Sequence, residues 1–206
     1  MSTIKGLHAV IIKDQVEEAM SSKGYAFFDS AKPYNVNLVG IRANNHRANK
    51  FDDTILAIYR NKVLEWEVQT FQVTTDPGLH HLRNPGNIKG TAILVPGQYR
   101  SVYQMGEHKG TPALVQWGGK VRVYRDRNKD GTLDMDPRNI DVGYFGINLH
   151  QAKSKGETYK VDRWSAGCQV FKNATDIKTF LATCQKASDI YGNSFTYTLL
   201  EQKDFT

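Results

Sequence analysis

Two side chains that can act together in covalent catalysis, an imidazole and a thiol, end two neighbouring motifs of the sequence. His150 ends Gly-Ile-Asn-Leu-His, and Cys168 ends Ser-Ala-Gly-Cys. They are 18 positions apart (168 − 150 = 18), which is enough chain for a strand, a turn and a return. A neutral imidazole can take the proton of a thiol, and the sulfur can then attack a peptide carbonyl and form a thioester. The pair therefore predicts a cysteine nucleophile with a histidine base.

The residues around this pair predict the elements that position it. Apolar residues at 145, 147 and 149 alternate with glycine and asparagine, which predicts a half-buried strand that ends at His150. Residues 165–168 are small and predict a tight turn, and a helical pattern follows Phe171. Backbone N–H groups and a nearby imidazole stabilise a thiolate, so this environment is expected to lower the pKa of Cys168.

Backbone and hydroxyl groups of the turn complete the candidate site. The N–H groups of Gly167 and Cys168 are placed by the sequence to serve an oxyanion hole. Ser165 is expected to hydrogen-bond either within the turn or to the histidine. The alternative to catalysis is that His150 is a structural histidine whose nitrogens are satisfied in the core. Isolated histidines with polar neighbours are expected at the surface, and these are His8, His46 and His108.

Length and composition limit the class of protein. With 206 residues and 40% hydrophobic content, the chain is expected to fold as one globular domain with a substantial core. No apolar run approaches the roughly 18 residues of a membrane helix, so membrane insertion is not expected. The amino terminus lacks the pattern of a secretory signal, which predicts synthesis in the cytoplasm without a signal peptide. Cys168 and Cys184 are expected as free thiols in a reducing compartment.

The chain is basic, and the distribution of its charge limits the class of partner. Lysine and arginine number 27 against 21 acidic residues, which gives a formal net charge of +6. The cations are scattered, and neither an arginine-rich block nor an RNA-binding signature is present, so nucleic acid is not an expected partner. A basic surface also suits an anionic polymer such as a bacterial cell wall. That partner is favoured only if the site independently points to it.

Residue patterns along the chain predict a mainly β protein with accessory helices, of the α+β class. Residues 1–35 are expected to form an N-terminal helical extension, and residues 36–206 one globular unit. A helix is predicted over 176–187, where apolar residues recur at helical spacing. Short strands with Gly and Pro between them favour a β-sandwich or barrel. The other predicted strands are 36–41, 54–59, 64–73, 91–95, 99–105, 113–117, 120–124 and 195–200.

A second group of chemistry-bearing residues follows the strand that ends at Tyr124. Carboxylate and amide oxygens recur at alternate positions, and Gly131 stands at the sixth position, as in a calcium loop of EF-hand type. Pro137 stands at the twelfth position, where such a loop has a closing glutamate. The alternative is an Asx turn that binds no metal. The chemistry itself requires no cofactor, and the expected ligands of a structural calcium ion are Asp126, Asn128, Asp130, Thr132 and Asp134.

The surroundings of His150 and Cys168 resemble the catalytic domain of the L,D-transpeptidase family. The motif of that family is a strand-borne histidine, then Ser/Thr-His-Gly-Cys, then an arginine two places after the cysteine. The resemblance extends over most of the chain from about residue 50 to 171. The segments similar to the family's opening hairpins and its Pro-x-Gly-x-Tyr/Phe strand are residues 55–59, 65–75 and 90–99.

This resemblance implies an L,D-transpeptidase-like β-sandwich, similar to single-domain lysins of bacteriophage type. In the family a backbone carbonyl just after the histidine orients the imidazole, which implies Gln151 here. Ala166 stands in place of the family's second histidine, and Val170 in place of its arginine. The second histidine is accessory in that family, so His150 can suffice as the base. Loss of the arginine implies water rather than an amine as the acyl acceptor, or a copy without catalysis.

These observations predict a cysteine-dependent hydrolase of peptidoglycan stem peptides, an endolysin-like L,D-endopeptidase or carboxypeptidase. It is expected to be a monomer that acts on the cell wall after release. One alternative is an L,D-transpeptidase that forms cross-links. Another is a non-catalytic protein of the cell wall or the virion that keeps the fold. A papain-like amidase is less favoured, because its cysteine normally precedes its histidine in the chain.

Overall fold

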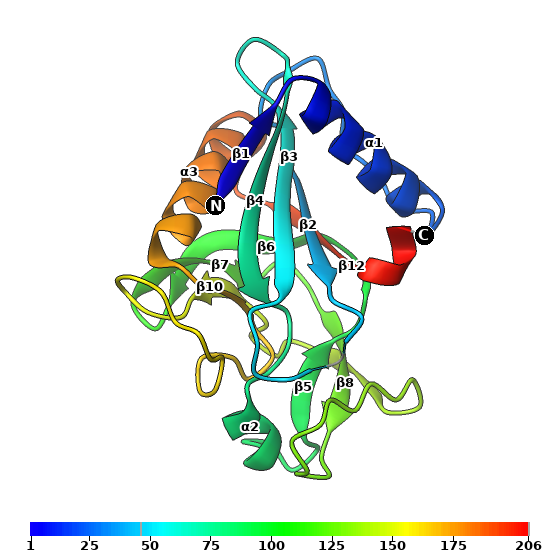
Figure 1. Cartoon of the computed structure of the whole chain (residues 1–206), viewed down its shortest axis with the longest axis vertical. Coiled ribbons are helices and arrows are strands. Elements are labelled where there is room, and N and C mark those ends of the chain that lie inside the picture. The colour runs from blue at the N-terminus through cyan, green and yellow to red at the C-terminus, as the bar shows by residue number, and fades with distance from the viewer. Residues whose placement is uncertain (46, 206) are drawn as a thin grey trace.

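Nine strands of the described residues, 1–45 and 47–205 of a computed structural model, form one mixed sheet (Figure 1). Their bounds are β1 (Ser2–Lys5), β2 (Asn37–Arg42), β3 (Asp53–Arg60), β4 (Trp66–Thr74), β6 (Gly97–His108), β7 (Thr111–Gln116), β10 (Leu149–Gln151), β11 (Gln169–Phe171) and β12 (Phe195–Glu201). Hydrogen bonds join them in the order β1-β4-β11-β10-β7-β6-β12-β2-β3, and β3 also pairs with β4, so the sheet closes on itself. The strand spacing in the sequence favours a β-sandwich or barrel, and the structure has this closed sheet. Closure leaves fewer strand edges unpaired.

A second, antiparallel sheet of three strands lies below the large sheet in Figure 1, beside a short helix. Its strands are β5 (Thr91–Leu94), β8 (Val121–Asp126) and β9 (Ile140–Gly143), joined in the order β5-β8-β9, and the helix is α2 (Leu79–Arg83). The sequence predicts β5 and β8 but neither β9 nor α2. β9 and α2 have four and five residues and lack the continuous apolar run that identifies the equally short β5.

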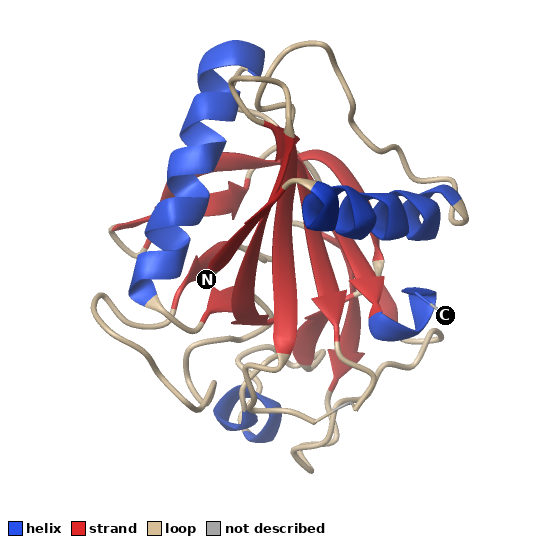
Figure 2. Cartoon of the chain, turned by 45° about the horizontal axis from the view of Figure 1, so that its top comes forward, coloured by secondary structure: helices blue, strands red, loops and turns tan. Residues whose placement is uncertain are grey.

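Two longer helices lie on opposite sides of the large sheet (Figure 2). The second of them, α3 (Ala174–Tyr191), begins after Asn173, whose side-chain oxygen accepts a hydrogen bond from the Thr175 N–H at 2.8 Å. Phe180 and Cys184 of α3 pack into the main core between the walls of the sheet. The helix predicted over 176–187 is therefore confirmed, with wider bounds.

The first helix, α1 (Leu7–Ser21), covers the outer face of β3 and β4. Its Val16 and Met20 pack in one apolar cluster with Leu56 of β3 and Val68 of β4. The alternation in residues 64–73 predicts a strand with one face in water. Its polar Gln69 is instead buried, on the face opposite α1, where the Thr183 hydroxyl of α3 donates to Gln69 Oε1 at 3.0 Å. Because β1 also pairs with β4, residues 1–35 supply a strand as well as the predicted helix.

The described residues are mainly β, with three α-helices and a final 3-10 turn, η1 (Gln202–Phe205), which confirms the predicted α+β class. Both cysteines are free, as predicted, and both are buried. In the described ranges no helix combines the length and the apolar character needed to cross a membrane. His8 is exposed as expected, whereas His46 lies outside the described residues.

Candidate active site

The parallel pair of β10 and β11 brings the imidazole and the thiol to one face of the sheet. Its register places His150 opposite Val170. Side chains alternate along extended backbone, so Cys168 shares a face with Val170, and His150 lies on that same face. The buried contacts agree, because Cys168, Val170 and Ala152 belong to one apolar cluster. Strand register therefore brings together the two residues that the sequence singles out.

His150 is held as a neutral base by its neighbours. It is 5% exposed, and its Nδ1 lies 2.8 Å from the Gln151 carbonyl oxygen, the contact that the resemblance implies. A carbonyl oxygen only accepts, so Nδ1 carries the proton and Nε2 keeps its lone pair. Burial lowers the pKa of His150 to about 4, although the hydrogen bond to Gln151 opposes this. At neutral pH the imidazole is therefore uncharged and can accept a proton at Nε2.

A second imidazole, which the sequence places at the surface, stacks on His150. The ring centroids of His108 and His150 are 4.2 Å apart, and the ring planes are 20° from parallel. The Asn148 side-chain N–H donates to His108 Nδ1 at 3.0 Å, so the proton of His108 is on Nε2. Burial, and then the charge of Lys109, lowers the pKa of His108. The expectation of a surface residue is wrong, because contacts with residues about 40 positions away half-bury this ring.

Cys168 is a protonated thiol rather than a thiolate. Its S–H donates to the Gly146 carbonyl oxygen at 3.3 Å, and Sγ accepts from the Asn148 N–H at 3.5 Å. The residue is 8% exposed, and burial raises its pKa to about 11, which the Asn148 N–H only partly opposes. The predicted lowering of this pKa is wrong, because the turn is buried and α3 begins only at Ala174. Among the described residues, no hydrogen bond joins the thiol to the imidazole.

The small-residue turn is closed by Ser165, which bonds within the turn and not to the histidine. Its Oγ donates to the Cys168 carbonyl oxygen at 2.8 Å and accepts from the Gly167 N–H at 3.1 Å. That N–H is therefore engaged and does not face an oxyanion, contrary to the prediction. The Cys168 N–H bonds to none of the described residues and remains as a donor. Gly167 has a φ of 123°, and a Cβ there would lie 2.4 Å from the Ala92 carbonyl oxygen, so only glycine fits.

The segment before β10 is irregular, although its alternation predicts a strand. Side-chain amides replace the hydrogen bonds of a strand ladder: Gln116 Oε1 accepts from the N–H groups of Phe145 and Ile147, both at 3.1 Å. In return, Asn148 Oδ1 accepts from the Gln116 N–H at 2.9 Å. Gly146, with a φ of 68°, lies between these anchors and places its carbonyl on the thiol. The segment thus covers Cys168.

Two cavities are lined by residues just before Cys168 in the sequence, and Cys168 itself lines neither. The larger, of about 660 Å³, is lined by both stacked histidines and by the loop that follows β10. Trp164 lines this cavity, whereas Ala166, two residues further on, lines a smaller one of about 320 Å³. Among the described residues that line the larger cavity none is acidic, and its four cations are Lys109, Lys153, Lys155 and Arg163.

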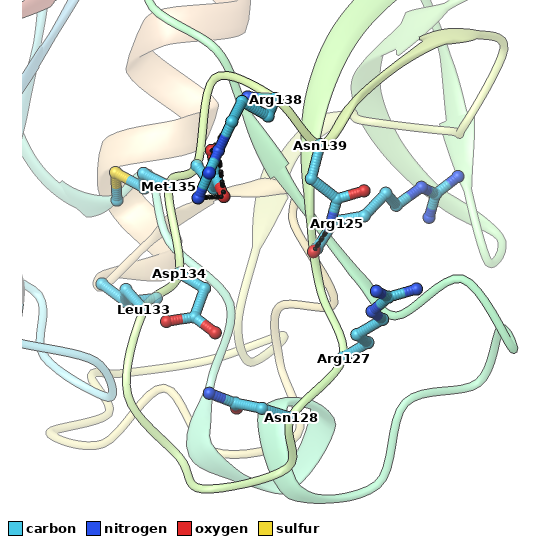
Figure 3. A pocket seen from close by; sticks show the side chains of 9 residues that line it. Arg125, Arg127, Asn128, Leu133, Asp134, Met135, Arg138 and Asn139 are labelled. Carbon is cyan, nitrogen blue, oxygen red and sulfur yellow. Dashed lines mark hydrogen bonds and ion pairs between the residues drawn. The ribbon is translucent and has the colours of Figure 1, made fainter.

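The candidate calcium ligands lie in the loop from β8 to β9, beside a separate cavity of about 650 Å³ (Figure 3). Asp126 is buried at the end of β8, and its Oδ2 accepts from the Asp134 N–H at 3.0 Å. The Asp130 N–H donates to Asn128 Oδ1 at 3.2 Å, and the Thr132 N–H to Asp130 Oδ1 at 2.7 Å, as in Asx turns. In the described part of the chain, no three His, Cys, Asp or Glu side chains converge as a preformed metal centre.

The raised pKa of Cys168 predicts slow alkylation at neutral pH. With a pKa of about 11, only about one thiol in 10⁴ is ionised at pH 7. In a Cys184→Ala background, the rate of carbamidomethylation by iodoacetamide should rise about tenfold per pH unit up to about pH 10. The mass of the intact protein measures this rate. A rate that levels off near neutral pH would indicate a thiolate–imidazolium pair instead.

No protein-family model matches this chain, and searches of curated proteins and of solved structures find no match either. The site is therefore interpreted from its own geometry, together with the residues that resemble the L,D-transpeptidase motif.

Proposed function

We propose that this chain is a cysteine-dependent hydrolase of peptidoglycan stem peptides, built on an L,D-transpeptidase-like fold. The observation that carries the proposal is the shared face of His150 and Cys168 on adjacent parallel strands, with the imidazole oriented by the Gln151 carbonyl. A nucleophile beside an oriented base is what covalent acyl transfer requires. The resemblance of the motifs supplies the substrate class, and the proposed activity is that of an endolysin-like L,D-endopeptidase or carboxypeptidase on the cell wall.

Acylation starts from a thiol and a neutral imidazole, because the pKa of Cys168 lies far above that of His150. Rotation of the Cys168 side chain away from the Gly146 carbonyl turns the S–H towards His150 Nε2. The proton moves to Nε2 as the sulfur attacks the peptide carbonyl, so the S–H bond breaks while the S–C bond forms. The imidazolium then gives this proton to the departing amine, the C–N bond breaks, and a thioester remains.

Deacylation uses the same base with water as the acceptor. His150 takes a proton from the water molecule that attacks the thioester, the S–C bond breaks, and the sulfur recovers the proton. The Cys168 N–H is the donor available to the oxyanion in both steps, since it bonds to none of the described residues. Val170, in place of the family's arginine, is buried with Phe51 and Val161. An apolar residue here holds no carboxylate of an incoming amine, which favours water.

The charge of the larger cavity supports an acidic peptide as the substrate. Its four cations, with no acid among the described lining residues, lie next to both histidines. Stem peptides carry free carboxylates, which such a cavity attracts, and this attraction weakens as the salt concentration rises. Trp164, which is 40% exposed, adds apolar surface at the same place. We therefore assign the acyl donor to this cavity and the departing amine to the side of Ala166.

Two other functions remain as alternatives, and the muropeptide experiment described below distinguishes them from the proposed one. The buried thiol with its raised pKa favours a non-catalytic protein of the cell wall or the virion. An L,D-transpeptidase that forms cross-links would use the same acylation, with an amine in place of water in the second step.

Incubation of the purified protein with muropeptides is expected to shorten stem peptides or to separate cross-linked ones, as identified by mass. A parallel reaction contains an excess of a D-amino acid as amine acceptor. Hydrolysis should dominate in both reactions, because Val170 offers no charge to hold the acceptor. A new cross-link or an exchanged D-amino acid as the main product would identify a transpeptidase. Muropeptides that stay unchanged at every protein concentration would leave the non-catalytic alternative.

A further inference from the structure

The loop between β8 and β9 carries oxygen-bearing side chains at alternate positions, away from the candidate active site. Figure 3 shows Asn128 and Asp134 pointing into the space that the loop surrounds. Gly131 has a φ of 84°, a left-handed conformation that lets the chain reverse just after Asp130. The loop is thereby shaped so that its ligands can face a common centre.

Asp126 supplies an observation that is independent of this loop pattern. It is fully buried, at 0% exposure, and its Oδ1 has no hydrogen-bond partner in the described residues. Its Oδ2 accepts from the Asp134 N–H, so the carboxylate faces the loop. A buried carboxylate oxygen without a donor has lost its hydration with no compensation, which is unfavourable.

The arginines that line the same cavity do not satisfy this oxygen. Arg125 is paired with Asp141 at 3.2 Å, and Arg138 with Asp136 at 2.9 Å. Arg127 points away from the interior of the loop in Figure 3. None of these three arginines therefore satisfies Asp126 Oδ1.

We propose that this loop binds one Ca²⁺ ion through the side-chain oxygens of Asp126, Asn128, Asp130 and Asp134 and the carbonyl oxygen of Thr132. Hard oxygen ligands on an adjustable loop fit the six to eight ligands that Ca²⁺ takes, whereas Mg²⁺ demands stricter octahedral geometry. The three aspartates do not converge in this structure. Asp130 is exposed, so binding moves it towards Asp126 and the loop closes around the ion.

The bound ion is structural and acts on the small sheet behind the Cys168 turn. Asp126 of β8 pairs with Thr91 of β5. The next residue of β5, Ala92, is the one whose carbonyl closely approaches Gly167. Within the loop, Leu133 packs against apolar residues of α2 and β5. The ion therefore fixes the end of β8 and, through β5, supports the turn without touching the reacting atoms.

Melting temperatures in CaCl₂ and in EDTA test this site without any need for activity. Pro137 in place of the closing glutamate leaves part of the coordination shell to water, so we expect a dissociation constant of about 10⁻⁴–10⁻³ M. At tenfold excess over that value, calcium should raise the melting temperature of the wild type by roughly 3–6 °C. Asp130→Ala should lose this rise. Asp136→Ala should keep it, because Asp136 lies in the same loop but pairs with Arg138.

Isothermal titration calorimetry of the same three proteins gives the binding constant directly, and Asp126→Asn provides a second ligand variant. Loss of binding in both ligand variants, with near-ultraviolet circular dichroism like that of the wild type, supports the proposal. An absent calcium effect in the wild type overturns it, and so does an equal shift in Asp130→Ala. A shift of equal size with Mg²⁺ overturns calcium as the cation.

Discussion

Replacing Cys168 by alanine is expected to abolish the release of products from muropeptides, a loss on the order of 10⁴-fold or more. The change removes the sulfur that forms the thioester. It leaves the turn intact, because the hydrogen bonds that close the turn come from Ser165. Product mass after timed incubation gives the rate. The mass of the intact protein should reveal an acyl adduct on the wild type that is absent from the variant.

Cys184→Ala is the matched control, since Cys184 is also a buried free thiol but lies on α3 in the main core. This variant should keep its rate and lose roughly 1 kcal/mol of unfolding free energy through a small cavity. Equal rates for the wild type and Cys168→Ala would end the proposal of a cysteine enzyme.

His150→Gln is expected to lower the rate of muropeptide cleavage at pH 7 by at least about 10²-fold, because glutamine cannot take up the proton of the thiol. In the wild type, the rate should hold as the pH falls from 7 to 5, since an imidazole with a pKa of about 4 stays neutral there. A histidine with an ordinary pKa of about 6.5 would lose most of its base form by pH 5. Rates measured from pH 4 to 8 distinguish the two. A rate that halves near pH 6.5 would contradict the buried neutral base.

The same pKa gives His150 a pH-dependent contribution to stability. The pKa of His150 is about 4 in the folded protein and about 6.5 in the unfolded chain, so the folded state binds fewer protons between these values. The contribution of His150 to the free energy of unfolding should therefore fall as the pH drops from about 6.5 towards 4, while buried Asp53, with a pKa raised to about 7, contributes in the opposite direction. Urea unfolding of the wild type and of His150→Gln at pH 7 and pH 5 isolates the His150 contribution. On going to pH 5 the free energy of unfolding should change less favourably in the wild type than in the variant, and an equal change in both proteins would contradict the buried neutral imidazole.

The features that the sequence predicts are those whose signal is local. β3, β4 and α3 are long enough for alternation or helical periodicity to identify them. The partner of the imidazole, the Gln151 carbonyl, was implied by the family resemblance, in which the residue directly after the histidine supplies it. The sequence predicts that Ser165 hydrogen-bonds either within the turn or to the histidine. Its partners in the structure, Gly167 and Cys168, lie within three residues of it.

The features that the sequence does not reveal depend on contacts between distant residues. His108 bonds to Asn148 across 40 positions, and Gln116 bonds to Ile147 across 31. Neither contact produces a strand or helix periodicity in the sequence, so the residues adjacent in sequence do not reveal it. The raised pKa of Cys168 has the same origin. Small residues predict the turn, but distant Phe51 belongs to the cluster that buries the thiol.

Closure of the large sheet has a consequence for how early the candidate site can form during folding. β11 joins β4 on one side to β10 on the other, with Val170 opposite Thr74, 96 positions earlier (170 − 74 = 96). Contacts so distant in sequence form late, because closing a long loop costs conformational entropy before the contact stabilises anything. The β3–β4 hairpin pairs residues that are close in sequence, so we expect it to form before β11 pairs with β4. We therefore expect a nascent chain to carry the thiol and the imidazole without the register that aligns them until β11 pairs with β4 and β10.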